Sequence, residues 1–385
     1  MKCAFAAVTL AAATGLSLGA VVSVESRQST SFVKTSGQQF TLDGSRFTVV
    51  GSNAYWMAQL PTSADITTAF NDLKNAGFTT LRTWGFNEVT SPSGTYYQLW
   101  NGKTPTLNTG PDGLAKFDTV VAAAKVAGIR LIIPLTNNWS DYGGMDVYVK
   151  QLLGSNDHSL FYTDSAVKAA FKNYINGFVG RYKNEPTVMA WELANEPRCR
   201  GSTITLITTC NTKTITSWAT EMSAYIKSID PNHLVATGDE GFYNRRDTLN
   251  YPYLGSEGID FDANLQISSI DFGTFHSYPE TWGQLLNAAD WGTQWIKGKY
   301  HAISQKNIGK PVIIEEFGVK YWNQASTYTK WWDAIISSGL AGDLIWQAGS
   351  TVSTGKTSDD GYAVFPGEAE YTLQTKYAAA LKARS

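Results

Sequence analysis

The sequence has little charge and almost no excess of either sign. Its 385 residues include 31 Lys and Arg and 33 Asp and Glu, for a formal net charge of −2, and charged residues make up 17% of the chain. Because no basic excess is available to neutralise a phosphate backbone, we expect no nucleic-acid partner. The chain is also 13% aromatic, which excludes a disordered protein, since disorder requires few aromatic residues and high net charge.

Long apolar runs are absent after the N-terminal segment. Lys2 is followed by a weakly apolar run, Ala4 to Val22, that is rich in Ala, Thr, Ser and Gly. A short basic start before such a run is typical of a secretory signal peptide, and the weak hydrophobicity disfavours the alternative, a membrane anchor. We therefore expect a signal peptide over 1–22 and a short pro-segment or flexible N-terminus over 23–31. The protein would be secreted and extracellular, with no membrane partner.

Cysteine and histidine are scarce. Cys3 leaves with the signal peptide, so Cys199 and Cys210 remain, 11 positions apart in a loop-like stretch. In a secreted protein this pair predicts one disulfide. The histidines are too scattered to form a recognisable ligand motif, and we expect neither a metal nor a cofactor. The four histidines are His158, His233, His276 and His301.

A helix, a glycine and a buried strand follow one another repeatedly along the chain. One example is the helical pattern Leu114 to Ala127, which ends at Gly128 and precedes the apolar stretch Ile129 to Leu135. Eight candidate strands result: Phe47–Asn53, Phe78–Trp84, Ile129–Leu135, Thr187–Leu193, Leu234–Gly238, Phe272–His276, Pro311–Phe317 and Leu344–Gln347. Apolar strands alternating with amphipathic helices predict an α/β fold, a (β/α)8 TIM barrel, as a single domain over 32–385. An open doubly wound sheet is the alternative, but the glycine-rich first turn typical of that fold is missing.

Carboxylates cluster at two of the predicted strand ends, where barrel enzymes hold their active sites. Glu192 and Glu196 stand at the end of the fourth strand and Glu315 and Glu316 at the end of the seventh, on opposite sides of an eight-strand ring. Trp and Tyr stand at most of the other strand ends. Two carboxylates across a pocket suit glycosidic cleavage, and aromatic rings bind the apolar faces of sugars. Since neighbours on a strand point to opposite sides, one of Glu315 and Glu316 should be structural. Glu192 is equally compatible with pairing to a buried cation such as Arg82.

Two motifs resemble glycoside hydrolase family 5, and within it the fungal secreted endo-β-1,4-mannanases. They are Trp191 to Pro197, WELANEP, and Ile313 to Gly318, IIEEFG. Further matching stretches stand in order along the chain: Asn53 to Trp56, Leu81 to Asn87, Asn138 to Gly144, Gly238 to Phe242 and Asp359 to Gly361.

The resemblance implies a role for each matching residue. Glu196 would be the acid/base and Glu316 the nucleophile of a retaining mechanism. The supporting residues would be Arg82 and Tyr278 beside Glu316, Asn195 at the sugar 2-hydroxyl, His276 at sugar hydroxyls or Glu196, Trp346 as the floor of the non-reducing side, Arg198 on the leaving-group side, Trp84 and Trp139 as further platforms, and Glu240 in the pocket. At ~5–5.5 Å, a charged Glu316 would raise the pKa of Glu196, and Arg82 would lower that of Glu316.

The implied function is a secreted, endo-acting hydrolase of internal β-1,4-mannosidic linkages in mannan, galactomannan and glucomannan. Its partners would be β-mannan polysaccharide and mannooligosaccharides, and we expect a monomer. The alternatives are an endo-β-1,4-glucanase of the same family and a non-catalytic carbohydrate-binding protein on a barrel scaffold.

Overall fold

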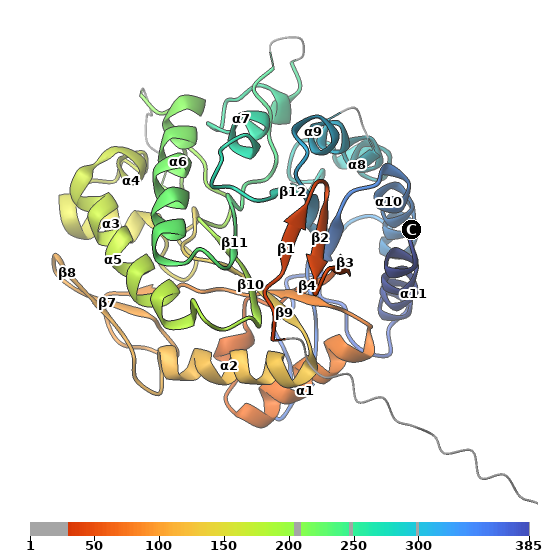
Figure 1. The fold of residues 1–385 in the computed structure, drawn as a ribbon, viewed down its shortest axis with the longest axis horizontal. Coiled ribbons are helices and arrows are strands. Elements are labelled where there is room, and N and C mark those ends of the chain that lie inside the picture. Colours follow the sequence, from red (N-terminus) through yellow and green to blue (C-terminus); the bar gives the residue numbers. More distant parts are fainter. Residues whose placement is uncertain (1–29, 204–208, 246–248, 298–299, 385) are drawn as a thin grey trace, which may run out of the picture.

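Eight parallel strands form a ring at the centre of the molecule, with helices around it (Figure 1). The structure, a computed structural model, is described here for residues 30–203, 209–245, 249–297 and 300–384. The expected signal peptide, 1–22, and most of the segment 23–31 lie outside these residues. The strands of the ring are β4 (Val49–Asn53), β5 (Thr80–Arg82), β9 (Arg130–Pro134), β10 (Val188–Glu192), β11 (Leu234–Ala236), β12 (Gly273–Ser277), β13 (Val312–Phe317) and β14 (Gly342–Ile345).

The ring closes because its first and last strands pair. Neighbouring strands follow one another in the chain, and β14 pairs in parallel with β4. Between β11 and β12, the amide of Asp271 donates to the carbonyl of Val235 at 2.8 Å, and the amide of His276 donates to the carbonyl of Glu240 at 3.2 Å. The predicted (β/α)8 barrel is therefore confirmed, and the open doubly wound sheet is excluded.

The covering helices end where the sequence places glycines. Gly128, Gly309 and Gly339 each terminate a helix in the left-handed conformation that favours glycine. The helices are α1 (Ser63–Asn75), α2 (Leu114–Ala127), α3 (Met145–Leu153), α4 (Leu160–Thr163), α5 (Ser165–Tyr182), α6 (Thr212–Ile229), α7 (Phe261–Leu265), α8 (Ala288–Lys297), α9 (His301–Ile308), α10 (Gln324–Ser338) and α11 (Ala369–Ala383), with short 3-10 helices η1 (Met57–Gln59), η2 (Tyr251–Tyr253) and η3 (Leu285–Asn287). Within the described ranges, none of these helices combines the length and apolarity needed to cross a membrane.

A small antiparallel sheet covers the N-terminal end of the barrel (Figure 1). It comprises β1 (Lys34–Ser36), β2 (Gln39–Leu42) and β3 (Ser45–Phe47). Phe40 of this sheet packs edge-on against Phe272, with ring centroids 5.3 Å apart, and joins the apolar cluster that fills this end of the barrel. That end is thus sealed by side chains, so the opposite end is left for a cleft.

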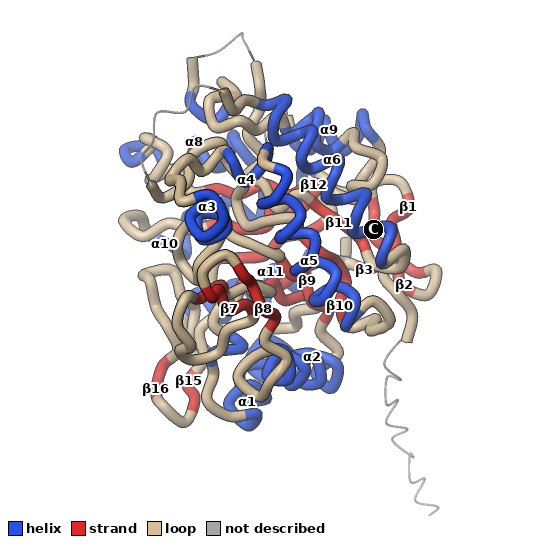
Figure 2. The backbone as a smooth tube through the Cα atoms, turned by 90° about the vertical axis from the view of Figure 1, so that its left-hand side faces the viewer, coloured by secondary structure: helices blue, strands red, loops and turns tan. Residues whose placement is uncertain are grey.

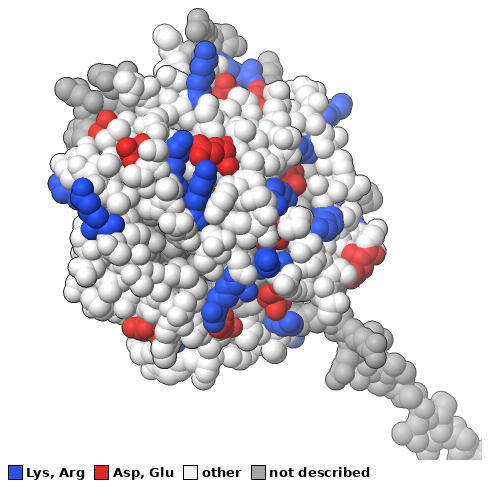
Figure 3. Space-filling view, turned by 60° about the vertical axis from the view of Figure 1, so that its left-hand side comes forward, with Lys and Arg blue, Asp and Glu red and all other residues white. Residues whose placement is uncertain are grey.

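The opposite end carries the longer loops and two small sheets (Figure 2). These are β6 (Glu88–Val89), β7 (Gln98–Asn101) and β8 (Thr104–Leu107), and the hairpin β15 (Thr351–Val352) with β16 (Gly355–Lys356). On the face drawn in Figure 3, basic and acidic side chains are interspersed and much of the surface is uncharged.

Candidate active site

A cleft of about 1000 Å³ opens at the C-terminal ends of the barrel strands. All the residues predicted for catalysis or substrate binding line it, except Arg82 and His276, which are fully buried beneath it. The residues that line it are Trp84, Trp139, Asn195, Glu196, Arg198, Glu240, Tyr278, Glu316 and Trp346, together with Tyr55, Asn137, Asp141, Tyr142, Tyr251, Thr281, Trp282, Gly283, Lys320, Asp360 and Tyr362.

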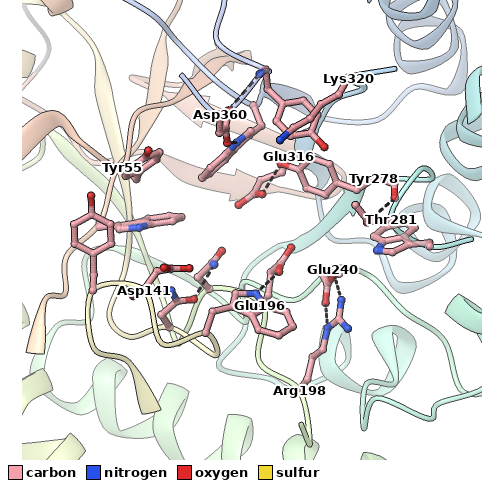
Figure 4. A pocket seen from close by; sticks show the side chains of 18 of the residues that line it. Tyr55, Asp141, Glu196, Arg198, Glu240, Tyr278, Thr281, Glu316, Lys320 and Asp360 are labelled. Atoms are coloured by element: carbon pink, nitrogen blue, oxygen red, sulfur yellow. Dashed lines mark hydrogen bonds and ion pairs between the residues drawn. The ribbon is translucent and has the colours of Figure 1, made fainter. Parts of the chain in front are cut away.

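Glu196 and Glu316 face one another across the middle of the cleft (Figure 4). A carboxylate oxygen of each lies within 4.8 Å of the other and of a ring nitrogen of His276. Both side chains are buried, so their charges act on one another with little screening by water. The 120 positions that separate them in the chain are thus bridged by the barrel.

Backbone bonds to both neighbouring chain segments fix Glu196 beyond the end of β10. The amide of Asn195 donates to the carbonyl of Thr136 at 2.8 Å, and that of Glu196 donates to the carbonyl of Gly238 at 2.9 Å. Glu196 has φ +50°, a left-handed conformation that costs a non-glycine residue about 1–2 kcal/mol. A Cβ at Gly238 would lie 2.0 Å from the carbonyl oxygen of Ala194, so only glycine allows this close approach.

Arg82 and Tyr278 hold the carboxylate of Glu316. The hydroxyl of Tyr278 donates to Oε2 at 2.8 Å, and Nη1 of Arg82 donates to Oε1 at 2.5 Å. Arg82 also donates from Nε to Oε2 of Glu192 at 2.8 Å and from Nη2 to Oδ1 of Asn195 at 2.9 Å. Glu192 is therefore the buried partner of a cation, as the sequence allowed.

The expectation that Glu315 and Glu316 point to opposite sides of the strand is wrong. Phe275 pairs with Ile314 but His276 pairs with Glu316, so β13 bulges at Glu315. The extra residue shifts the alternation, and the Glu315 carboxylate also enters the barrel, 3.6 Å from Nε of Arg82 and 3.5 Å from Nε2 of His276. Glu315 is fully buried and does not line the cleft, which fits a structural role.

Aromatic rings form one wall of the cleft. The indole of Trp346 donates to Asp360 at 2.8 Å, and the ring of Tyr55 stacks on it at 5.6 Å with an interplanar angle of 12°. Trp84 lies 5.9 Å from Trp346, and the guanidinium of Arg82 lies 4.9 Å from the Trp84 ring. These fixed rings offer apolar faces of the kind on which sugar rings stack.

Arg198 stands on the other side of Glu196 and is held by Glu240 (Figure 4). The pair is bidentate, with distances of 2.6 Å from Nε and 2.5 Å from Nη2. The guanidinium lies 5.1 Å from the Trp139 ring, and Cys199, the next residue, is joined to Cys210 in a disulfide with a Cα–Cα distance of 5.5 Å. The disulfide expected from the sequence is therefore present beside the cleft.

The chain is similar to known proteins in both sequence and structure. Residues 41–351 match the family model described as cellulase (glycosyl hydrolase family 5). The chain belongs to glycosyl hydrolase family 5. It is 45% identical to the mannan endo-1,4-beta-mannosidase F of Aspergillus fumigatus over 349 residues, which cover 89% of this chain and 76% of that protein.

Two further mannanases are similar to this family 5 chain, one in sequence and one in structure. The mannan endo-1,4-beta-mannosidase A of Aspergillus aculeatus is 43% identical over 362 residues, 92% of each protein. The crystal structure of an endo-1,4-beta-mannanase from Rhizomucor miehei superimposes with a TM-score of 0.85 at 40% identity, covering 91% of this chain and 99% of that one.

In this family 5 site, the pKa values of Glu196 and Glu316 are shifted in directions opposite to those expected from the sequence. Burial raises the pKa of Glu196, but the hydrogen bond and charge of His276, with Arg198 and Trp139, outweigh burial and lower it to about 2. Nδ1 of His276 lies 2.7 Å from Oε1, and the Trp139 indole donates to Oε2 at 2.6 Å. The expectation of a raised pKa for Glu196 is wrong here because it left out these donors.

The pKa values of Glu316 and His276 are raised, whereas that of Glu196 is lowered. Burial and the charge of Glu196 raise the pKa of Glu316, although His276, Arg82 and Tyr278 act against the increase. Burial lowers the pKa of His276, but the surrounding carboxylates, Glu316 foremost, raise it well above its ordinary value. The charged imidazolium is therefore favoured at this position, in contact with Glu196.

Among the described residues, one group of side chains has potential metal-ligand atoms close enough together to hold a metal ion. It consists of Glu196, His276 and Glu316. Their atoms already have partners within the protein: His276 bonds Glu196, Trp139 donates to Glu196, and Arg82 and Tyr278 donate to Glu316. This donor set suits a hydrogen-bonded acid pair, because the guanidinium supplies the positive charge that a cation would bring.

Several lining residues were not assigned a role from the sequence. Tyr142 has φ +60° in a loop whose amide at Gly144 donates to the buried carboxylate of Glu88 at 2.9 Å. Asp360 and Tyr362 come from the segment after β16, well beyond the end of β14. An inspection of strand ends misses them, and the one available signal for Asp360 is the Asp-Asp-Gly motif in that segment.

Proposed function

We propose that the chain is an endo-β-1,4-mannanase that cleaves with retention of configuration. The observation that supports this most is the distance of at most 4.8 Å between carboxylate oxygens of Glu196 and Glu316. Retaining glycosidases hold their carboxyl groups ~5–5.5 Å apart, whereas inverting ones need ~6.5–9.5 Å for a water molecule. The mannanase names of the relatives support the substrate class.

In the first step, Glu316 attacks the anomeric carbon of the sugar bound over Trp346. Arg82 donates to one oxygen of its carboxylate and Tyr278 to the other, so the group is held in place at the cleft. Glu196 donates a proton to the glycosidic oxygen, the leaving part of the mannan departs as an alcohol, and a covalent glycosyl-enzyme remains. Asn195, beside Glu196, bonds the 2-hydroxyl in this proposal.

In the second step, Glu196 removes a proton from water as the water oxygen displaces Glu316. We infer that the proton needed for the first step reaches Glu196 from His276, across the 2.7 Å that separates Nδ1 and Oε1. The transfer turns a neighbouring imidazolium and carboxylate into a neutral pair, and the proton that Glu196 takes from water in the second step returns across the same contact to His276. It needs no movement of either side chain.

Secretion belongs to the same proposal. It is supported by the basic start and weakly apolar run of residues 1–22 and by the Cys199–Cys210 disulfide, a bond typical of oxidising compartments. N-terminal sequencing of protein recovered from the culture medium of an expressing fungus tests it, since an intact Met1 would contradict cleavage of the predicted peptide.

Isosteric replacement of the two carboxylates tests the catalytic assignment. Glu196→Gln and Glu316→Gln should each abolish hydrolysis of galactomannan while mannohexaose still binds. Glu221→Gln on α6, which makes the same chemical change at a partly exposed residue paired with Lys168 and Lys172, should retain full activity. Full activity in either cleft variant would refute the roles.

Product analysis tests the stereochemistry and the substrate. Mannohexaose digestion followed by NMR should show the β-anomer first, and cleavage at internal linkages. A first-formed α-anomer would contradict retention. Faster hydrolysis of a soluble cellulose derivative than of galactomannan would instead favour the endo-β-1,4-glucanase alternative.

A further inference from the structure

Two aromatic side chains are exposed in the described part of the chain, and they are adjacent. Tyr321 is 79% exposed and Trp322 37% exposed. Leu285, 47% exposed, and Leu286, 92% exposed, belong to the segment that Trp322 contacts. We call these four residues the rim patch, and a grouping of exposed apolar side chains of this kind marks a binding surface more often than isolated ones do.

The rim patch continues the wall of the cleft. Lys320, the residue before Tyr321, lines the cleft, and so does Gly283, two positions before Leu285. The two segments that carry the patch come from the loops after β13 and β12, and they are joined by the indole of Trp322, which donates to the carbonyl of Leu285 at 2.7 Å. Figure 4 shows Lys320 and Thr281 at this side of the cleft.

The backbone below the rim patch is held in place by a carboxylate. Glu280 accepts hydrogen bonds from the amides of Lys320 at 2.8 Å and Tyr321 at 2.9 Å. The ammonium of Lys320 lies 4.4 Å from the ring of Tyr362, another residue of the cleft wall. The two exposed rings therefore sit on a fixed loop, which lowers the entropy lost when a ligand binds.

We propose that the rim patch binds sugar residues of the mannan chain that extend beyond the cleft, an inference that rests on the proposed function. The cleft, at about 1000 Å³, is at the upper end for a site that encloses one small ligand, whereas a polysaccharide continues past it. A chain leaving on the side of Lys320 and Gly283 passes over the patch. An exposed tyrosine ring, which has an apolar face and a hydroxyl at its edge, fits a polymer with apolar faces and hydroxyl edges.

Substitution of Tyr321 tests the rim patch without touching the chemistry. Tyr321→Ala should raise KM for galactomannan about three- to tenfold, the effect of losing one ring contact, with kcat unchanged. kcat/KM for mannotriose, which is too short to span cleft and patch, should stay at the wild-type value. Tyr321→Phe should restore the polymer KM. Val126→Ala, on the outer helix α2 at an 83% exposed residue, is the control.

A binding measurement separates affinity from turnover. In a Glu316→Gln background, Tyr321→Ala should reduce retardation by galactomannan in native gel electrophoresis and leave mannotriose affinity unchanged. The Val126→Ala control in the same background should be retarded as strongly as the parent.

Each other outcome overturns the proposal. An unchanged polymer KM in Tyr321→Ala refutes it, and an equal loss on polymer and mannotriose assigns the loop a structural role instead. If sedimentation shows that the wild type is a dimer and that Tyr321→Ala is a monomer, while KM for the polymer is unchanged, the patch serves self-association instead. A wild type inactive on every mannan refutes the proposed function itself, and the rim patch assignment then fails with it.

Discussion

Replacing Arg82 with Met should remove about 3–5 kcal/mol of folding stability, because it leaves buried carboxylates without their cation. The guanidinium is fully buried and donates to Glu192, Glu316 and Asn195, and Glu315 lies 3.6 Å from its Nε. A domain of ordinary stability has about 5–15 kcal/mol in total, so the variant would fold only marginally.

The pH dependence identifies the cause of this loss. Without the cation, the folded-state pKa values of the neighbouring carboxylates rise, and a raised folded-state pKa gives stability that is present at low pH and lost as the pH rises. The destabilisation of Arg82→Met should therefore be larger at about pH 7.5 than at about pH 4.5. Urea unfolding followed by Trp fluorescence at both pH values measures it.

Two comparison variants complete the Arg82 experiment. Arg82→Lys keeps the charge but cannot reach all the acceptors at once, so it should be destabilised less than Arg82→Met. Arg181→Met breaks the partly exposed ion pair with Asp118 and should cost at most about 1 kcal/mol. A loss below about 1 kcal/mol for Arg82→Met, or one that does not vary with pH, would refute the buried-charge argument.

Three further variants have defined outcomes. Replacing Cys199 and Cys210 by Ser opens a loop of 11 positions and should cost about 3 kcal/mol, seen as a lower Tm; an unchanged Tm would contradict it. Burial raises the pKa of Asp343 to about 7, so its contribution to stability is lost as the pH rises from 3.8 through that value. Asp343→Asn should therefore flatten the dependence of the free energy of unfolding on pH over this range, measured by urea unfolding. The same pH dependence in variant and wild type would exclude the shift. In Gly143→Ala, at φ +91°, the new Cβ would lie 2.3 Å from the carbonyl oxygen of Glu88, so the loop that carries Tyr142 must move, and KM for mannohexaose should rise several-fold; an unchanged KM would separate the loop from binding.

Much of the barrel could be predicted because its signals are local. Ala124 and Val120 recur on one face of α2, Gly128 ends that helix, and Arg130–Pro134 is short and buried. Each unit repeats this order, and parallel strands with helical crossovers leave few topologies. The position of Glu196 followed from the same logic, since the carboxyl ends of barrel strands meet at one face.

The remaining features depend on contacts between distant segments. The bulge at Glu315 arises where β13 pairs with β12, so strict alternation along one strand could not reveal it. Asp360 reaches the cleft from beyond β16 and meets Trp346 only in the folded chain. The depressed pKa of Glu196 needs the positions of His276 and Trp139, which come from other strand ends.

In the proposed mechanism, the acid function belongs to a group of side chains rather than to Glu196 alone. Four buried carboxyl groups, of Glu192, Glu196, Glu315 and Glu316, share two cations, Arg82 and His276, through contacts of 3.7 Å or less. If every group were ionised, negative charge would exceed positive charge in a site with little water to screen it, so uptake of a proton by the group is favoured. Arg82 keeps its proton throughout, so the imidazole is the one of these two cations that can give a proton up. Because His276 touches Glu196 and does not line the cleft, the proposed mechanism has the proton pass from the imidazole to Glu196 and then to the glycosidic oxygen in the cleft.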